Sequence, residues 1–156
     1  MLHLIPKSLH RLLLRIGYRL RHHWRQTTGL ASDGVVIVGR DFDGQILLLR
    51  HSYGPPGWYF PGGGIGRREN AEDAARRELR EETGCEIEGL TLIGVVEEIL
   101  SGAPHRSQVF DGVINCMPQA DGREILEARF FPTHSLPEPL SPRTRARLEM
   151  WQSRGT

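Results

Sequence analysis

Three glutamates in the middle of the chain are the residues whose type and spacing are best suited to chemistry. Glu78, Glu81 and Glu82 stand at positions i, i+3 and i+4, so a helix would place all three carboxylates on one side. Nearby arginines would turn such a face into an ion-paired surface. A glycine-rich turn beside it would instead suit Mg²⁺, which prefers few carboxylates together with substrate phosphates and water. The glutamates alone leave both interpretations open.

The element that must position these glutamates is a helix over about 70–83. Asn70 can cap its first turn, and Asp73 follows three residues later, as in a capping box. Gly84 suits the left-handed position that ends a helix. One side of the helix is small and apolar, formed by Ala71, Ala74, Ala75 and Leu79. The spacing therefore predicts a helix that packs through this side and presents its carboxylates on another.

A glycine-rich loop, Phe60-Pro61-Gly62-Gly63-Gly64, precedes this helix. Pro61 restricts the backbone, whereas the glycines allow positive φ and the close approach of a ligand. The loop is not a P-loop, because that motif needs Gly-Lys-Ser/Thr and no lysine follows Lys7. It is not a dinucleotide fingerprint either, because Arg67 stands where G-x-G-x-x-G requires its third glycine.

Together the loop and the helix resemble the Nudix box, G-x5-E-x7-R-E-U-x-E-E-x-G-U, in which U is a bulky aliphatic residue. Cys85 occupies the last aliphatic position, where cysteine can act as a small hydrophobe. The resemblance is close from Gly63 to Cys85 and weaker over about 33–135. The fixed positions are filled by Gly63, Glu69, Arg77, Glu78, Leu79, Glu81, Glu82 and Gly84.

The resemblance implies an enzyme that hydrolyses a nucleoside diphosphate linked to another moiety, with Mg²⁺ or Mn²⁺ as cofactor. Carried over by position, Glu78, Glu81 and Glu82 are expected to bind the metal. Glu81 or Glu78 is also expected to orient or deprotonate the attacking water. Glu69 and Arg77 would form an ion pair that holds the loop against the helix, and we count Arg77 among the catalytic residues for this reason.

Residues around the box extend the expected site. The backbone of Gly62 and Gly63 would approach the metal and the substrate, with a carbonyl oxygen of Gly62 as a metal ligand. Trp58 and Tyr59 could stack a nucleobase. A general base from outside the box is also possible. The candidates are Glu97, Glu98 and Glu127, and we expect Glu127, at the start of the last strand, to belong to the catalytic residues.

The substrate is left open between a nucleoside triphosphate and a nucleotide sugar. A second function remains in view, because some Nudix-like domains bind nucleotides as sensors without hydrolysing them. Such sensors usually lose carboxylates of the box, and this chain keeps all of them. Net charge is +1, so no general attraction to nucleic acid is expected.

The rest of the sequence predicts an α/β fold. Short apolar runs at 35–38 and 45–50 flank Asp43-Gly44, a hairpin signal, and further strands are expected at 90–99, 106–116 and 124–131. Ser141 and Pro142 can begin a last helix. We expect a Nudix-like α/β/α sandwich with a mixed sheet at 29–156, and a helical extension at 1–28.

The sequence of this extension predicts a basic amphipathic helix over about 6–25. Its basic face carries Arg11, Arg15 and Arg19, and no acidic residue occurs in positions 1–32. The helix could pack on its own domain, contact a second copy, lie on a membrane surface, or be an organelle transit peptide. The apolar face consists of Leu9, Leu12, Leu13, Ile16, Leu20 and Trp24.

Length and cysteine content set the remaining expectations. A chain of 156 residues favours one domain. Two cysteines, Cys85 and Cys116, are expected not to form a disulfide framework, which favours a cytoplasmic protein, in contact with a membrane at most through its periphery. No apolar run reaches the length of a membrane span.

Overall fold

A mixed sheet of six strands forms the centre of the molecule. The computed structural model describes residues 6–155, apart from the side chains at positions 21, 22, 24–26 and 155. The strand order is β4-β5-β1-β2-β6, and β3 pairs with β1. β1 runs parallel to β5, and the other pairs are antiparallel. The strands are β1 (Ser32–Arg40), β2 (Ile46–His51), β3 (Gly62–Gly64), β4 (Ile87–Leu100), β5 (Ala103–Ile114) and β6 (Ile125–Phe131).

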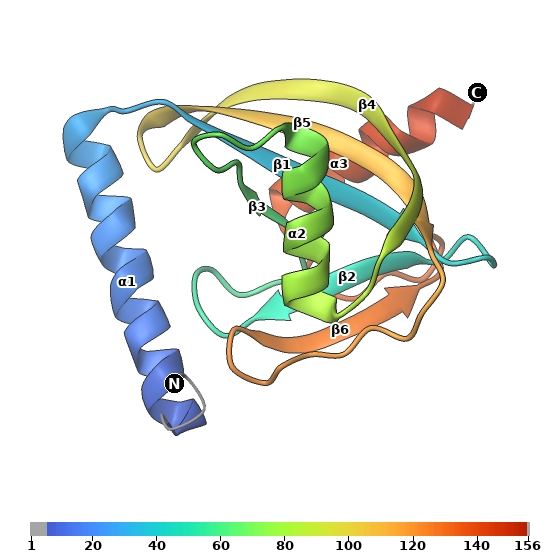
Figure 1. Ribbon diagram of the computed structural model, residues 1–156, viewed down its shortest axis with the longest axis horizontal. Coiled ribbons are helices and arrows are strands. Elements are labelled where there is room, and N and C mark those ends of the chain that lie inside the picture. Colours follow the sequence, from blue (N-terminus) through green and yellow to red (C-terminus); the bar gives the residue numbers. More distant parts are fainter. Residues whose placement is uncertain (1–5, 156) are drawn as a thin grey trace.

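Two helices cover opposite faces of this sheet. Figure 1 looks onto α2 (Ala71–Thr83), in front of the sheet, while α3 (Pro142–Gln152) runs behind it. One apolar core joins α2 to the sheet through Ala75 and Leu79, and a second core contains Leu148 of α3. A short 3-10 turn, Ser153–Gly155, follows α3. The expected α/β/α sandwich with a mixed sheet is confirmed.

The central strands read as continuous apolar runs because both of their faces are buried. Along β2, Leu47 and Leu49 belong to the core under α2, whereas Ile46 and Leu48 belong to the core under α3. All four are 0% exposed. Successive side chains of a strand point to opposite faces, so one apolar run fills both layers and fixes the strand at the centre of the sandwich.

Both caps of α2 are formed by the residues predicted from the sequence, Asn70 and Gly84. The Asn70 side chain accepts a hydrogen bond from the backbone N–H of Asp73 at 2.8 Å. Gly84 adopts φ 72° at the other end and donates its N–H to the Arg80 carbonyl. Ser141 caps α3 in the same way, with Pro142 as its first residue. These caps confirm the predicted bounds of α2 and the predicted start of α3.

The expectation that the two cysteines form no disulfide framework was wrong, because Cys85 and Cys116 are joined by a disulfide. Cys85 follows the end of α2, and Cys116 follows the end of β5. The antiparallel pairing of Ile87 with Ile114 brings the two segments together, so the Cα atoms of the cysteines lie 6.0 Å apart. Their separation of 31 residues in sequence hid this contact.

The N-terminal helix α1 (Lys7–Thr28) extends three residues beyond the predicted end and stands beside the sandwich (Figure 1). No helix in the described part of the chain is long and apolar enough to cross a membrane. The predicted apolar face does not pack on the domain: its described leucine and isoleucine side chains are between 45% and 65% exposed, and they are Leu9, Leu12, Leu13, Ile16 and Leu20.

Candidate active site

Arg77 on α2 holds the glycine loop against the helix. Its Nε and Nη2 donate to the two carboxylate oxygens of Glu69 at 2.7 and 2.9 Å. Nη2 also donates to the Gly64 carbonyl at 2.9 Å, and Nη1 donates to Glu78 at 2.8 Å. A longer contact of 3.4 Å reaches Glu81. One guanidinium thus joins the loop, the turn before α2 and two of the three glutamates.

The ion pair of Glu69 with Arg77 shifts the pKa of both residues toward their charged forms. Hydrogen bonds from Arg77 and from the backbone N–H of Gly66 lower the pKa of Glu69 to about 2. Hydrogen bonds to Glu69 and Glu78 raise the pKa of Arg77. Both groups are therefore charged at neutral pH, and the bidentate pairing is geometrically specific. The pair has the form expected from the sequence for the link between loop and helix.

Glu82 lies at the bottom of the site with 7% of its surface exposed. Its Oε2 accepts the backbone N–H of Gly62 at 3.0 Å. Burial raises the pKa of Glu82 well above its usual value, the hydrogen bond from Gly62 opposes this, and the negative charges of Glu78, Glu124 and Glu81 add to it. Burial also raises the pKa of Glu78. Burial and the neighbouring carboxylates thus outweigh the hydrogen bond from Arg77 at Glu78 and the one from Gly62 at Glu82.

Glycine is required at the point where loop and helix meet. A Cβ at Gly63 would lie 2.3 Å from Cδ of Glu78. Gly62 has φ 157°, and a Cβ there would lie 2.2 Å from the Val35 carbonyl oxygen. The missing side chains bring the backbone of β3 directly against the carboxylates of α2, as the loop sequence suggested.

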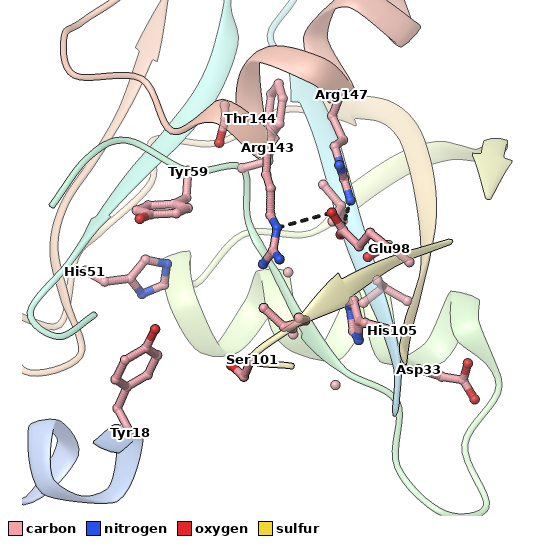
Figure 2. A pocket seen from close by; sticks show the side chains of 18 residues that line it. Tyr18, Asp33, His51, Tyr59, Glu98, Ser101, His105, Arg143, Thr144 and Arg147 are labelled. Atoms are coloured by element: carbon pink, nitrogen blue, oxygen red, sulfur yellow. Dashed lines mark hydrogen bonds and ion pairs between the residues drawn. The ribbon is translucent and has the colours of Figure 1, made fainter. Parts of the chain in front are cut away.

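Two cavities meet at the Gly62–Gly64 strand. One, of about 560 Å³, is lined by Glu78, Glu82 and Glu124, and by residues of α1. The other, of about 350 Å³, runs from Tyr59 and His51 to Glu98 and His105. Figure 2 shows the second cavity, with Tyr18, His51 and Tyr59 on one side and Glu98, His105 and Asp33 on the other.

The far wall of the second cavity is an ion-paired cluster. Arg143 and Arg147 of α3 both contact the carboxylate of Glu98 on β4 (Figure 2). Arg147 is 4% exposed, so this pairing fixes α3 against β4. The carboxylate of Glu98, one of the alternative bases, is thus engaged by two arginines. Glu97 lies outside both cavities and lines a neighbouring hollow near Pro104.

Glu124 is the site residue that sequence analysis missed. It lies immediately before β6, lines the cavity with Glu78 and Glu82, and accepts a hydrogen bond from the Tyr53 hydroxyl at 2.5 Å. The sequence pattern gave little indication of this role, because a glutamate just before a strand looks like any exposed loop residue. Its charge acts on both Glu78 and Glu82, which identifies it as the fourth carboxylate of the cluster.

Two expected site residues lie elsewhere. Glu127 on β6 pairs with Arg50 of the neighbouring strand β2, because residues at these positions face each other in the sheet. The Trp58 indole packs edge-on against Phe131, with ring centroids 4.9 Å apart. Among the residues that the structure describes, neither lines the two cavities. Tyr59, next to Trp58, points the other way and does line the second cavity.

The carboxylates fit a divalent cation chemically. In the described part of the chain, no group of three His, Cys, Asp or Glu side chains is arranged as a metal site. Arg77 donates to Glu78 and Glu81, and the N–H of Gly62 donates to Glu82. Burial nevertheless raises the pKa of both Glu78 and Glu82, so a cation would stabilise their charged forms, and hard oxygen ligands suit Mg²⁺ or Mn²⁺. Glu81, 59% exposed at its side chain, stands at the open rim of this cluster.

The comparisons agree with this geometry. The family model described as NUDIX domain matches residues 31–151. A putative 8-oxo-dGTP diphosphatase, YtkD of Bacillus subtilis, is 31% identical over 134 residues, which cover 80% of this chain and 82% of that protein. An RNA pyrophosphohydrolase of Teredinibacter turnerae is 40% identical over 63 residues, but the match spans only 40% of this chain and 37% of that protein.

A solved structure shows the same fold. The MutT NUDIX hydrolase from Burkholderia pseudomallei superposes with a TM-score of 0.70 at 29% identity, covering 78% of this chain and 98% of that one. The matched family region contains the whole loop, α2 and the four carboxylates described above. By its sequence match, its fold and the arrangement of its box residues, this chain belongs to the Nudix family.

Proposed function

We propose that the protein is a Mg²⁺-dependent pyrophosphohydrolase that cleaves a nucleoside diphosphate linked to another moiety. The observation that carries the proposal is the cluster of Glu78, Glu82 and Glu124 around one cavity whose wall is the Gly62–Gly64 backbone. The relatives named as pyrophosphohydrolase and diphosphatase support the reaction class. Mn²⁺ is an alternative cation for the same oxygen ligands.

Each residue of the cluster has a role in this proposal. Glu78, Glu81, Glu82 and the Gly62 carbonyl would hold the cation, and Glu124, which lines the same cavity, would be a further oxygen donor. When bound, the cation supplies charge neutralisation on the diphosphate and lowers the pKa of the attacking water. The Glu69–Arg77 pair keeps the loop at its distance from α2, and Gly62 and Gly63 admit the phosphates to the backbone.

Proton removal from the attacking water is assigned to the rim of the cluster. Glu81 is exposed there and makes a long contact of 3.4 Å with the end of the Arg77 guanidinium, so its carboxylate can turn toward water. Glu124 is the second candidate, oriented by the Tyr53 hydroxyl. Replacing Glu81 and Glu124 separately by glutamine distinguishes the two candidates. The variant that lacks the general base should lose the increase of kcat with rising pH, and the other variant should keep it.

A nucleoside triphosphate is the proposed substrate, with a nucleotide sugar as the second candidate. The name of the Bacillus subtilis relative supports an oxidised purine triphosphate. The RNA pyrophosphohydrolase relatives make a 5′-triphosphorylated RNA oligonucleotide a necessary member of any panel. Turnover of that oligonucleotide alone would contradict our expectation that nucleic acid is not a partner.

The test is release of phosphate and pyrophosphate from a substrate panel, with Mg²⁺ or with EDTA. The panel contains ordinary and oxidised nucleoside triphosphates, ADP-ribose, nucleotide sugars, dinucleoside polyphosphates and the RNA oligonucleotide. We expect turnover of one class only with Mg²⁺. No turnover across the panel, together with measurable nucleotide binding, would replace the proposal by a non-hydrolytic sensor module.

We propose further that α1 is an extension outside the catalytic domain that lies on an anionic membrane surface. The family match begins only at residue 31. The exposed apolar side chains of α1 meet the acyl boundary of a bilayer, and its acid-free sequence suits anionic headgroups.

Co-sedimentation with vesicles of mixed phosphatidylcholine and phosphatidylserine tests this contact. Leu12→Asp in the exposed face of α1 is expected to abolish binding, whereas Leu92→Asp on edge strand β4, where the leucine is 47% exposed, leaves it unchanged. Equal binding by both variants would contradict the proposal. A concentration-dependent dimer lost only in Leu12→Asp would assign the face to a second copy of the chain.

A further inference from the structure

The side of α1 that faces the domain forms part of the walls of both cavities. Tyr18 lines the cavity that contains Glu78 and Glu82 and also the one that contains Tyr59 and His51. His10, Leu14 and Gly17 recur on the same side of the helix and line the first cavity. The helix outside the catalytic sandwich therefore borders the space that a substrate must occupy.

Polar contacts fix α1 in this position. Arg11 donates from Nε and Nη2 to the Gly122 carbonyl at 3.0 and 2.6 Å. Arg15 donates to the Ser52 carbonyl at 3.2 Å. Ser52 directly precedes Tyr53, and Gly122 lies two residues before Glu124; Tyr53 and Glu124 are the hydrogen-bonded pair at the carboxylate cluster. The helix thus binds the two loops that lead into the site.

The Tyr18 ring has a defined place between these loops. Its centroid lies 5.8 Å from that of Tyr53, and its edge is close enough to Gly54 that a Cβ there would lie 3.6 Å from the ring. Figure 2 shows the Tyr18 hydroxyl end directed toward His51, with Tyr59 beyond it. His51 and Tyr59 pack edge to face, with ring centroids 5.6 Å apart.

The two ends of the cleft are therefore lined by different kinds of side chain. Glycines and carboxylates at the centre suit the diphosphate and its cation, whereas one end of the second cavity is bordered by aromatic rings. A planar nucleobase is the part of a nucleotide that aromatic rings bind, and stacking on one such ring contributes about 1–3 kcal/mol. Both regions share the Gly62–Gly64 backbone, so one nucleotide can span them.

We infer that Tyr18 of α1 is a specificity-determining residue, whose ring contacts the nucleobase of the substrate beside Tyr59 and His51. This inference rests on the proposed function and adds a contact from outside the family domain. In the described structure α1 completes the aromatic end of the cleft. Leu13, at the margin of the apolar face, lines the first cavity, whereas the rest of that face, including Leu12 and Ile16, lines neither. Membrane contact and base contact can therefore use different sides of α1.

The test uses the full chain with three single variants. Tyr18→Ala is expected to raise KM for the preferred nucleotide about tenfold, as loss of one stacking contact predicts, while kcat changes by less than about twofold. Tyr18→Phe keeps the ring and is expected to behave as the wild type. Leu20→Ala removes an apolar side chain that is 65% exposed on the same helix and serves as the matched control.

A base-free substrate separates base contact from a general effect on the cleft. Ribose 5-triphosphate is expected to show the same KM with Tyr18→Ala as with the wild type. A KM for the nucleotide that Tyr18→Ala leaves unchanged, or that rises equally for ribose 5-triphosphate, overturns the inference. Neither outcome affects the proposed hydrolysis.

Failure of the proposed function itself has a different signature, because the wild type would then hydrolyse no substrate. In that case calorimetric titration with ADP and GDP decides the role of Tyr18. Weaker binding by Tyr18→Ala than by Leu20→Ala supports the base contact in a sensor module. Equal affinities for both variants overturn it.

Discussion

Glu69 is held in its charged form by Arg77, and this has a consequence for stability. Its pKa is about 2, against a usual value of 4.5. A lowered carboxylate pKa stabilises the folded state above pH 4.5, and that contribution is lost as the pH falls from 4.5 toward 2. Glu69→Gln is therefore expected to lower the melting temperature at pH 7, with a difference from wild type that shrinks toward pH 2.

Thermal unfolding at several pH values measures this effect. Glu149→Gln, at an exposed position of α3, is the control and should follow the wild type throughout. A constant difference between Glu69→Gln and the wild type from pH 7 to pH 2 would show that the ion pair with Arg77 is not its cause.

Glu82 predicts the opposite pH dependence. Its pKa is raised by burial and by neighbouring carboxylates, so the metal-free folded protein binds a proton more tightly than the unfolded chain. Stability without metal should then fall as the pH rises above 4.5. Mg²⁺ replaces that proton, so we expect it to raise the melting temperature more at pH 8 than at pH 5.

Glu82→Gln removes the buried charge and serves as the comparison. In EDTA at pH 8 it should unfold at a higher temperature than the wild type, and Mg²⁺ should stabilise it less. Differential scanning fluorimetry reports both quantities. A wild-type melting temperature that ignores Mg²⁺ at pH 8 would argue against the proposed metal role of these carboxylates.

The sequence predicted the ion pair of Glu69 with Arg77, two residues that lie within one short segment. Glu69, Arg77 and Gly64 meet across a loop and one helix, so their spacing along the chain carries their geometry. Glu124 and Tyr18 reach the same cleft from distant segments, and no local spacing records that approach. The two neighbours Trp58 and Tyr59 divide between core and cavity because alternate residues of an extended segment face opposite sides.

At the scale of the elements, the close contact of β3 with α2 yields a prediction about glycine. Gly63→Ala places a methyl group against the Glu78 carboxylate, which must then leave its position. We expect a folded protein with kcat/KM reduced at least tenfold, since displacement by about 1 Å is costly in a catalytic site. Gly64→Ala meets no atom within 4 Å and should melt as the wild type does.

Circular dichroism melting and kcat/KM, measured on both variants, check this pair. Wild-type activity in Gly63→Ala would mean that the position of Glu78 is not needed for the reaction. Loss of fold in Gly64→Ala would contradict the open space around that residue.

The elements themselves were largely predictable, for reasons visible in their ends. Asn70 and Gly84 bound α2, and Ser141 with Pro142 begins α3, because caps satisfy backbone groups locally. The disulfide was not predictable from 31 residues of separation, since it depends on the register of β4 with β5. The orientation of α1 was not predictable either, because polar contacts from Arg11 and Arg15 turned its apolar face outward.

At the scale of the whole molecule, charge is divided between α1 and the sandwich. Positions 1–32 contain six basic residues and no acidic one, and the rest carries 14 basic and 19 acidic residues. If α1 binds anionic lipid, raising the salt concentration from 0.15 to 1 M shortens the screening length from about 8 to about 3 Å. Vesicle binding should therefore weaken strongly, while hydrolysis of a soluble nucleotide changes little.

Co-sedimentation and turnover in the same salt series measure the two effects separately. Binding that is insensitive to salt would favour a purely apolar contact. Binding to neutral vesicles equal to that on anionic ones would contradict the role of the arginines.

The central claim is that the glutamates of α2 perform metal-dependent hydrolysis, and one comparison tests it most directly. Glu81→Gln and Glu86→Gln are measured beside the wild type for kcat/KM on the best substrate with Mg²⁺. Glu86 is an exposed residue just beyond α2, paired with Arg80, and its variant should keep wild-type activity. We predict that Glu81→Gln loses at least about 100-fold with an unchanged melting temperature. Wild-type turnover in a folded Glu81→Gln protein would contradict the proposed role of Glu81 in hydrolysis.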